Sequence, residues 1–390
     1  MELKNLPELS ERINKAILQK ERIILYGDSD MDGVSSVLIM KEAIKNKGGE
    51  IAVIYFPDRE EEGYGLTKQA LEQFKDLAPA VIIMMDMGIS NFEEIESANK
   101  KKFEVLMIDH HQPLEGKLPK ASIIVDPKQP GEEYPFAGFA ACGLTWKVAE
   151  RLMGDANTEQ IRKSMLELAT LCTIADMMPR EADNVEIIEE GIPYIERSWR
   201  PGIQVFFSFP PFEDFLSLEE KITHMISVLN VRDVKDGFPA AYRLLTALGE
   251  EEAQELLGRL WELNKVRQDN IRAFVEEAEE RAVRHKDDPI IFEGTKELDY
   301  VLLGKAASIL AERHQKPVFL YRERGEQNEA LGSVRAPKGY DTVVAMTECA
   351  DLLYTYGGHA QASGFRLSLD NLEEFKKQLT KYFLSHGKNA

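Results

Sequence analysis

Short apolar runs alternate with helical patterns along the first 125 residues, and this alternation constrains the fold more than any other feature. Five Val- and Ile-rich runs are predicted to be strands, at residues 22–27, 51–56, 80–85, 103–108 and 122–125. The segments 6–20, 35–46, 67–75 and 91–101 carry apolar residues at helical spacing. The sequence therefore predicts an α/β domain whose parallel sheet has helices on both faces, and whose ligands gather where the strands end.

The rest of the chain changes character twice. Residues 142–197 and 216–285 have mostly helical patterns, and the charged run 251–284 has no Pro and only one Gly, as a spacer helix would. Beyond it, short strand-like runs at 289–292 and 317–321 flank a predicted helix at 305–313. We therefore expect three regions: an α/β domain at 1–200, a helical connector at 201–285, and a second, smaller α/β domain at 286–390.

Composition limits the classes of function and the compartment. The chain has 48 Lys and Arg against 67 Asp and Glu, a net charge of −19, which argues against a basic coat that holds duplex DNA. Cys142, Cys172 and Cys349 lie far apart, which excludes a thiolate zinc cluster, and we expect three buried free thiols in a reducing compartment. No stretch of 18 apolar residues occurs, so we expect a cytoplasmic protein without membrane contact.

A cluster of carboxylates follows the first of the predicted strands. Asp28, Asp30 and Asp32 stand at alternate positions directly before Gly33, and unpaired anions of this kind are costly to bury. A calcium loop of EF-hand type opens in the same way, but it needs a helix before the loop and a Glu six residues after the Gly, where this chain has Ile39. The cluster therefore indicates a different site for divalent cations.

Three further candidates occupy comparable positions. Asp86 follows the third predicted strand, Asp109, His110 and His111 follow the fourth, and Asp176 ends an apolar helix. A lone Asp can also be a helix cap or turn residue, and a His pair can be a satisfied part of the core. Together, however, these oxygen and imidazole donors suit two ions of Mn²⁺ or Mg²⁺. Two such ions can activate a water for in-line attack on phosphorus, so we expect phosphoester hydrolysis.

The order of these motifs resembles the DHH phosphoesterase superfamily, and the likeness extends over nearly the whole chain. Segments 26–28, 62–66, 126–130 and 200–202 are similar to its RecJ branch, the single-strand-specific exonucleases, while 332–335 and 357–365 resemble the DHH-associated domain. The resemblance implies a parallel-sheet DHH domain with helices on both faces, joined by a helical spacer to a smaller α/β DHH-associated domain that grips substrate.

The resemblance also implies roles for individual residues. The implied metal ligands, for two Mn²⁺ with Mg²⁺ as the alternative, are Asp28, Asp30, Asp32, Asp86, His110 and Asp176, with Asp86 bridging the ions. Asp109 would orient the site, and His111 would contact the scissile phosphate or the leaving oxygen. The implied substrate contacts are Arg335, Gly357, Gly358 and His359 at phosphate and Tyr64 at a base, since aromatic rings stack on single strands.

The implied activity is 5′-to-3′ hydrolysis of single-stranded DNA, in preference to RNA, in repair or recombination, with replication or repair proteins as candidate partners. The chain departs from the RecJ pattern at residues 230–234, where the usual Arg is displaced, and at 298–304, where a usual His is lacking. Because the sequence ends soon after the second domain, we expect no oligonucleotide-binding barrel. Two alternatives stay open: a phosphodiesterase for very short oligonucleotides or signalling dinucleotides, and a non-catalytic replication or repair scaffold.

Overall fold

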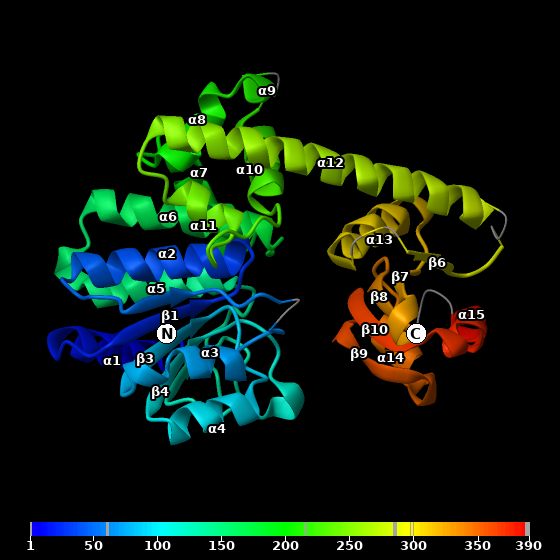
Figure 1. The fold of residues 1–390 in the computed structure, drawn as a ribbon, viewed down its shortest axis with the longest axis horizontal. Helices are drawn as coiled ribbons and strands as arrows, with labels where there is room; N and C mark the ends of the chain where they lie inside the picture. Colours follow the sequence, from blue (N-terminus) through cyan, green and yellow to red (C-terminus); the bar gives the residue numbers. More distant parts are fainter. Residues whose placement is uncertain are drawn as a thin grey trace. The chain divides into compact units, whose positions relative to one another are not determined.

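The chain divides into two compact units. The computed structural model describes residues 2–59, 62–213, 215, 217–283, 287–296, 298 and 300–386. The first unit comprises residues 1–264 and the second comprises residues 265–390, so that the boundary falls inside one long helix. Each unit has a five-stranded sheet of its own (Figure 1).

The first sheet is parallel throughout, as the alternating sequence pattern predicts. Its strands stand in the order β2-β1-β3-β4-β5, and every neighbouring pair is parallel. They are β1 (Ile23–Gly27), β2 (Val53–Tyr55), β3 (Ala80–Met85), β4 (Phe103–Ile108) and β5 (Ile123–Val125). Since all five run in one direction, the segments that follow them meet at one edge of the sheet.

Helices cover both faces of this sheet, and strand β1 supplies side chains to both sides. Ile23 and Leu25 belong to one apolar core and Ile24 and Tyr26 to the other, as expected for a strand that is buried on both faces. The first core packs against α1 (Leu6–Leu18), α2 (Met31–Asn46) and α5 (Ala141–Met153), and the second against α3 (Lys68–Gln73) and α4 (Phe92–Lys100) (Figure 1).

Further helices extend the first of these cores. They are α6 (Glu159–Ala175), α7 (Asp183–Glu196), α8 (Pro201–Ser208), α9 (Pro210–Glu213), α10 (Leu218–Leu229) and α11 (Ala240–Leu245). The long helix α12 (Glu250–Val283) contributes Ala253 and Leu257 to this core and Phe274 and Ala278 to a core of the second unit. No helix of the described residues is long and apolar enough to cross a membrane.

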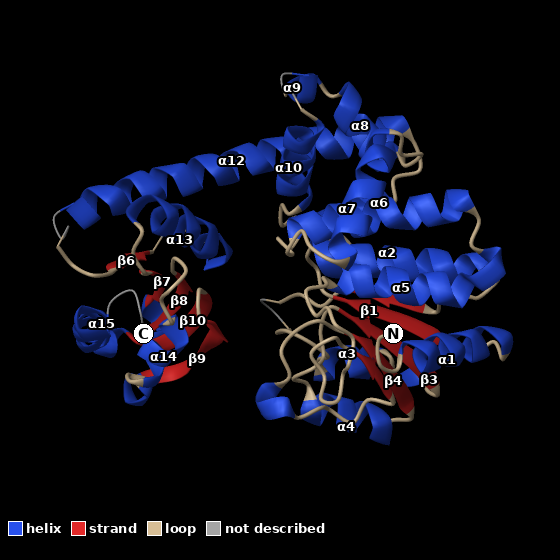
Figure 2. Cartoon of the chain, turned by 180° about the vertical axis from the view of Figure 1, so that it is seen from behind, coloured by secondary structure: helices blue, strands red, loops and turns tan. Residues whose placement is uncertain are grey.

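The second unit has a mixed sheet in the order β6-β7-β8-β10-β9 (Figure 2). Strand β6 (Ile291–Thr295) runs parallel to β7 (Val318–Arg324), whereas β8 (Glu329–Arg335), β9 (Leu353–His359) and β10 (Ala362–Ser368) continue it with antiparallel pairs. Helix α13 (Tyr300–His314) and part of α12 cover one face. Helices α14 (Thr342–Thr347) and α15 (Leu372–His386) contribute to the other.

One expectation about the cysteines is wrong. The sequence favours three free thiols, but Cys142 in α5 and Cys172 in α6 form a disulfide across 30 residues, with their Cα atoms 6.6 Å apart. Cys349 is free and buried. The sequence does not reveal this pair, because its two residues lie 30 positions apart and meet only through the packing of helix α5 against α6. The cysteines therefore no longer support a reducing compartment.

Candidate metal centre

The loop after β1 places three carboxylates within six residues. Helix α2 begins at Met31, four residues before the predicted start, because Asp30 caps it: the Oδ1 atom of Asp30 accepts the N–H groups of Asp32 at 3.1 Å and Gly33 at 3.2 Å. A Cβ atom on Gly33 would lie 2.4–2.7 Å from backbone atoms of Asp28. Glycine at this position therefore allows the loop to fold tightly against the start of the helix.

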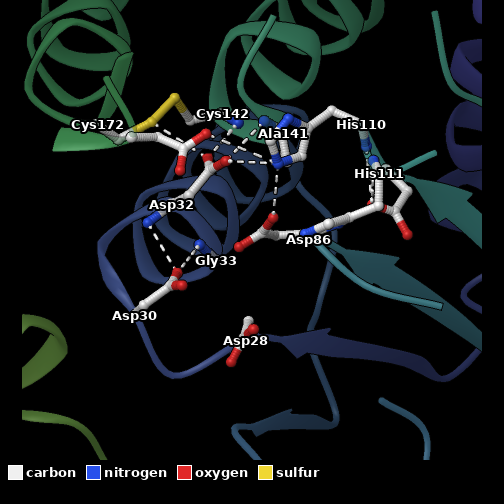
Figure 3. A network of polar contacts seen from close by, with 12 residues as sticks. Asp28, Asp30, Asp32, Gly33, Asp86, His110, His111, Ala141, Cys142 and Cys172 are labelled. Atoms are coloured by element: carbon white, nitrogen blue, oxygen red, sulfur yellow. Dashed lines mark hydrogen bonds and ion pairs between the residues drawn. A yellow bond between two sulfur atoms is a disulfide. The ribbon is translucent and has the colours of Figure 1, made fainter. Parts of the chain in front are cut away.

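Asp32 is fixed by a second helix. Its side chain is buried, and its two oxygens accept the N–H groups of Ala141 at 2.8 Å and Cys142 at 2.7 Å, in the first turn of α5 (Figure 3). The first N–H groups of a helix lack partners within the helix and carry partial positive charge, so they stabilise an anion. This contact holds Asp32 in place beside the end of β1.

Asp86 stands directly after β3 in a backbone conformation that is uncommon for a residue with a side chain. Its φ angle is 63°, and its N–H donates to the carbonyl of Ile108 at 2.9 Å. The hydroxyl of Tyr64 donates to the carbonyl of Asp86 at 3.1 Å. The side chain of Asp86 points toward the ring of His110, with Oδ1 and Nε2 3.4 Å apart (Figure 3).

Asp109 and His110 have different surroundings at the end of β4. The Oδ1 atom of Asp109 accepts the N–H of His110 and the ring Nδ1–H of His111, both at 2.8 Å, and Oδ2 accepts the N–H of Ile89 at 3.0 Å. The Nε2 atom of His110 instead lies 3.7 Å from Asp32 and 3.8 Å from Asp176. Asp109 thus organises the loop, while His110 presents a nitrogen to the carboxylates.

The structure brings the six implied ligands into one neighbourhood. They form two groups whose ligand atoms lie within 4.8 Å of one another: Asp28 with Asp30 and Asp86, and Asp32 with His110 and Asp176. Asp86 also groups with His110 and His111, so it lies between the two sets. A carboxylate in that position is placed to be shared by two cations.

The charges of these carboxylates are unbalanced without cations. Burial raises the pKa of Asp32 and of Asp86 well above the usual value, and nearby carboxylates raise both further. Burial and the charge of Asp30 raise the pKa of Asp176 to about 6, and the Oδ2 atom of Asp176 is buried without a hydrogen-bond partner. Bound divalent ions would lower these pKa values and give that oxygen a partner.

Arg59 is a functional candidate that sequence reasoning missed. Its guanidinium contacts both oxygens of Asp28 and lies 2.9 Å from an oxygen of Asp30. Burial raises the pKa of Asp28, and Arg59 offsets part of this effect; for Asp30, Arg59 and the N–H of Gly33 outweigh burial and the pKa is lowered. Its position in the sequence could have indicated this role, because Arg59 is a basic residue that follows the second predicted strand and so lies at the same edge of the sheet as the carboxylates.

The pKa values of the two histidines shift in opposite directions. Burial lowers the pKa of His110 to about 4, which leaves a neutral imidazole that can bind a metal. Burial also opposes the charge on His111, but the hydrogen bond and charge of Asp109 prevail and raise its pKa. Oxygen donors together with a neutral imidazole fit Mn²⁺ or Mg²⁺. Cys142 and Cys172 lie close to Asp32, but they offer no thiolate because they form a disulfide. The residues present therefore fit a pair of hard divalent ions.

Tyr64 lies at the rim of the metal centre. Its ring is half exposed, meets the ring of His111 edge-on with centroids 6.1 Å apart, and has the guanidinium of Arg59 5.3 Å from its centre. Part of the ring is therefore open to a ligand while the hydroxyl is held by the site.

The implied phosphate contacts belong to the second unit. Strand register places Arg335, Ala362 and His359 in one row across β8, β10 and β9, and Ser333, Gly364 and Gly357 in the next row. Residues directly opposite one another share a face, as do residues two apart, so both rows lie on the same face of the sheet. Gly358, with φ of 129°, precedes His359. Side chains with donor groups thus border a floor of small residues.

The fold and these two groups of residues define a class: an α/β domain with a centre for divalent cations, followed by a second α/β domain with donors for anions. Comparison with known families gives the same division. The model of the DHH family, N-terminal domain, matches residues 22–173, and that of the DHHA1 domain matches residues 287–385. The chain belongs to the DHH family, as the motif order predicts.

Its relatives are RecJ proteins. The single-stranded-DNA-specific exonuclease RecJ of Bacillus subtilis is 32% identical over 383 residues, which are 97% of this chain and 48% of that protein. RecJ of Thermus thermophilus in complex with Mn²⁺ has a similar fold, with a TM-score of 0.84 and 24% identity over 99% of this chain and 55% of that one. A structure of exonuclease RecJ bound to manganese gives a TM-score of 0.77 and 26% identity, covering 98% and 95% of the two chains. The chain spans about half the length of the RecJ proteins of Bacillus subtilis and Thermus thermophilus that it matches.

Replacing Gly33 by Ala tests the tight loop. The added Cβ would lie less than 3 Å from the backbone of Asp28, so the loop must shift, and we expect stability to fall by roughly 1–3 kcal/mol. Mn²⁺ binding, measured by calorimetric titration, should weaken about tenfold or more because Asp28 and Asp30 move. The matched control is Gly258→Ala in α12, where a Cβ meets nothing within 4 Å and should stabilise the helix by up to about 1 kcal/mol. Unchanged stability and metal binding in Gly33→Ala would contradict this account.

The raised pKa values of Asp32, Asp86 and Asp176 predict a pH dependence. Each group makes its full contribution to stability below its unfolded pKa, about 4, and this contribution is lost as the pH rises through the folded value, about 6 for Asp176. Bound Mn²⁺ removes that loss, so the rise in Tm on adding Mn²⁺ should be larger at pH 8 than at pH 5. Without metal, Asp32→Asn should lose less stability than the wild type between these pH values. Equal losses, measured by thermal unfolding in a chelator, would show the raised pKa values to be wrong.

Proposed function

We propose that this chain is a two-metal-ion phosphodiester hydrolase that degrades single-stranded DNA from the 5′ end and acts in repair or recombination in the cytoplasm. The position of Asp86 between the two ligand groups carries this proposal. A single shared carboxylate, with two further ligands nearby on one side and three on the other, suits a pair of ions rather than one. The metal-bound RecJ relatives, whose ions are Mn²⁺ and Mg²⁺, support the choice of ions.

The roles of the residues follow from their surroundings. Asp28, Asp30, Asp32, Asp86, His110 and Asp176 would hold the ions. When bound, the two ions supply an activated water and offset charge on the phosphate. Asp109 holds the ring of His111 through Nδ1 and raises its pKa, which leaves Nε2 available to donate to a phosphate or leaving oxygen when the imidazole is protonated. Lys128 donates to the carbonyl of His110 and thereby helps to position that residue.

Single-stranded nucleic acid is the proposed substrate because the first unit has an exposed aromatic ring for a base and the second unit has donor side chains for phosphates. The exposed part of the Tyr64 ring can stack on a base of any kind. The donor-lined face that bears Arg335 and His359 suits the phosphate backbone. The names of the curated relatives, single-stranded-DNA-specific exonucleases, favour DNA over RNA. Replication or repair proteins remain proposed partners.

Substituting the metal ligands tests the chemistry. Asp86→Asn and Asp30→Asn should each lower Mn²⁺-dependent hydrolysis of single-stranded DNA by roughly a hundredfold or more, because each removes a negative ligand from the paired-ion site. Circular dichroism should show the fold retained. The exposed Asp155 gives the control, and Asp155→Asn should keep wild-type activity. Full activity in Asp86→Asn would overturn the proposed mechanism.

A length series decides the class of substrate in the same assay. DNA and RNA strands of two to forty nucleotides, labelled at either end, are digested with Mn²⁺ or Mg²⁺. Mononucleotides released progressively from the 5′ end of long DNA are the expected product. A sharp preference for strands of two to five nucleotides would favour the short-oligonucleotide phosphodiesterase instead. Absence of Mn²⁺ binding in a calorimetric titration would favour the scaffold.

A further inference from the structure

Helix α13 begins over the same face of the second sheet that carries Arg335. Tyr300 and Gly304 are one helical turn apart and share a face of α13. A Cβ atom on Gly304 would lie 3.0 Å from Nη2 of Arg335 and 3.3 Å from Oγ of Ser333. A Cβ atom on Gly364 would lie 3.6 Å from the hydroxyl oxygen of Tyr300. Two glycines therefore make room for three donor side chains around one small space.

The register of the strands places the Tyr300 hydroxyl close to both Ser333 and Arg335. Gly364 pairs directly with Ser333, so the hydroxyl stands over the row that contains Ser333 and next to the row that contains Arg335. The guanidinium of Arg335 donates to Oγ of Ser333 at 3.3 Å, which leaves the Ser333 hydroxyl proton free to donate in turn. The three groups can thus converge on one ligand.

The charges in this space favour an anion. Arg335 also donates to the carbonyl of Val334 at 2.8 Å, but among the described residues no carboxylate forms an ion pair with it. Burial lowers the pKa of Arg335, and the titratable group that faces its guanidinium is Tyr300. The Tyr300 hydroxyl has no hydrogen-bond partner among the described residues, and burial raises its pKa, so it stays a neutral donor. A partly buried guanidinium without a counter-ion is stabilised by an anionic ligand, which supplies the missing negative charge.

We propose that the hydroxyl of Tyr300, together with Ser333 and Arg335, binds a phosphate group of the substrate. Tyr300 would be a substrate-binding residue additional to the implied phosphate contacts, because its hydroxyl lies by the space that Ser333 and Arg335 border. This inference rests on the proposed function. A tyrosine donates across the whole neutral range, whereas an imidazole changes its charge there, so the grip on phosphate would be insensitive to pH.

Binding of single-stranded DNA to the full chain tests this without hydrolysis. Each variant is made in an Asp86→Asn background, and its affinity for a fluorescent oligonucleotide is measured by anisotropy over a range of salt concentrations. Tyr300→Phe should weaken binding about three- to tenfold at every salt concentration, because it removes one neutral hydrogen bond. Arg335→Gln should also reduce the slope of log affinity against log salt by about 0.7, as the loss of one ionic contact to a single strand does.

Controls separate the failure of this inference from failure of the proposed function. Tyr354→Phe removes the hydroxyl of an exposed tyrosine on β9 and should bind as the background does. If Arg335→Gln weakens binding and Tyr300→Phe does not, the role of Tyr300 is wrong and the proposed function stands. If neither the background protein nor the wild-type chain binds single-stranded DNA, the proposed function itself is contradicted.

Two further readouts identify the phosphate and exclude a merely structural effect. Oligonucleotides with a 5′-phosphate and with a 5′-hydroxyl are compared: a loss confined to the former assigns a terminal phosphate, and a loss with both assigns an internal phosphodiester. With Asp86 restored, Tyr300→Phe should raise KM and leave kcat within about twofold. A fall in kcat with unchanged KM would contradict a role in binding phosphate.

Discussion

The repulsion among carboxylates at the end of the parallel sheet is the constraint on which the first unit depends. Five Asp side chains and one His bring their ligand atoms into two adjoining groups, each within 4.8 Å. Among the described residues, Arg59 is the cation that forms ion pairs with them directly. Such an arrangement persists only because the surrounding fold fixes each side chain and because cations from solution can offset the charge.

Backbone groups do much of this fixing. The first turn of α2 holds Asp30, the first turn of α5 holds Asp32, and the loop after β3 holds Asp109 through the N–H of Ile89. Asp86 keeps a left-handed backbone conformation in the same region. The proposed ligands are therefore positioned by elements far apart in the sequence, and metal binding by them would depend on the packing of α5 against α2. In the second unit, glycines help to position side chains by leaving space for those that come from α13 and β8.

The sequence was most informative where one local rule decides the outcome. Strands β3 and β4 have the predicted bounds because β3 is a continuous apolar run and β4 is apolar except for Glu104. Asp86 and Asp109 could be placed because they follow those runs directly. Strands β8, β9 and β10 were missed because glycine and polar residues interrupt them, as in β9 with its Gly357–Gly358 pair. Arg59, Tyr300 and the Cys142–Cys172 pair depend on contacts between distant segments, which periodicity does not report. The roles assigned to the site residues stay proposals.

The long helix α12 has a consequence for how the two units depend on each other. Residues near its start complete the large core of the first unit, and Phe274 and Ala278 near its end complete a core of the second. The single helix α12 therefore contributes side chains to the hydrophobic cores of both units. Loss of helical structure near the middle of α12 is therefore expected to weaken the packing of both cores, because the core residues before that point belong to one unit and those after it to the other.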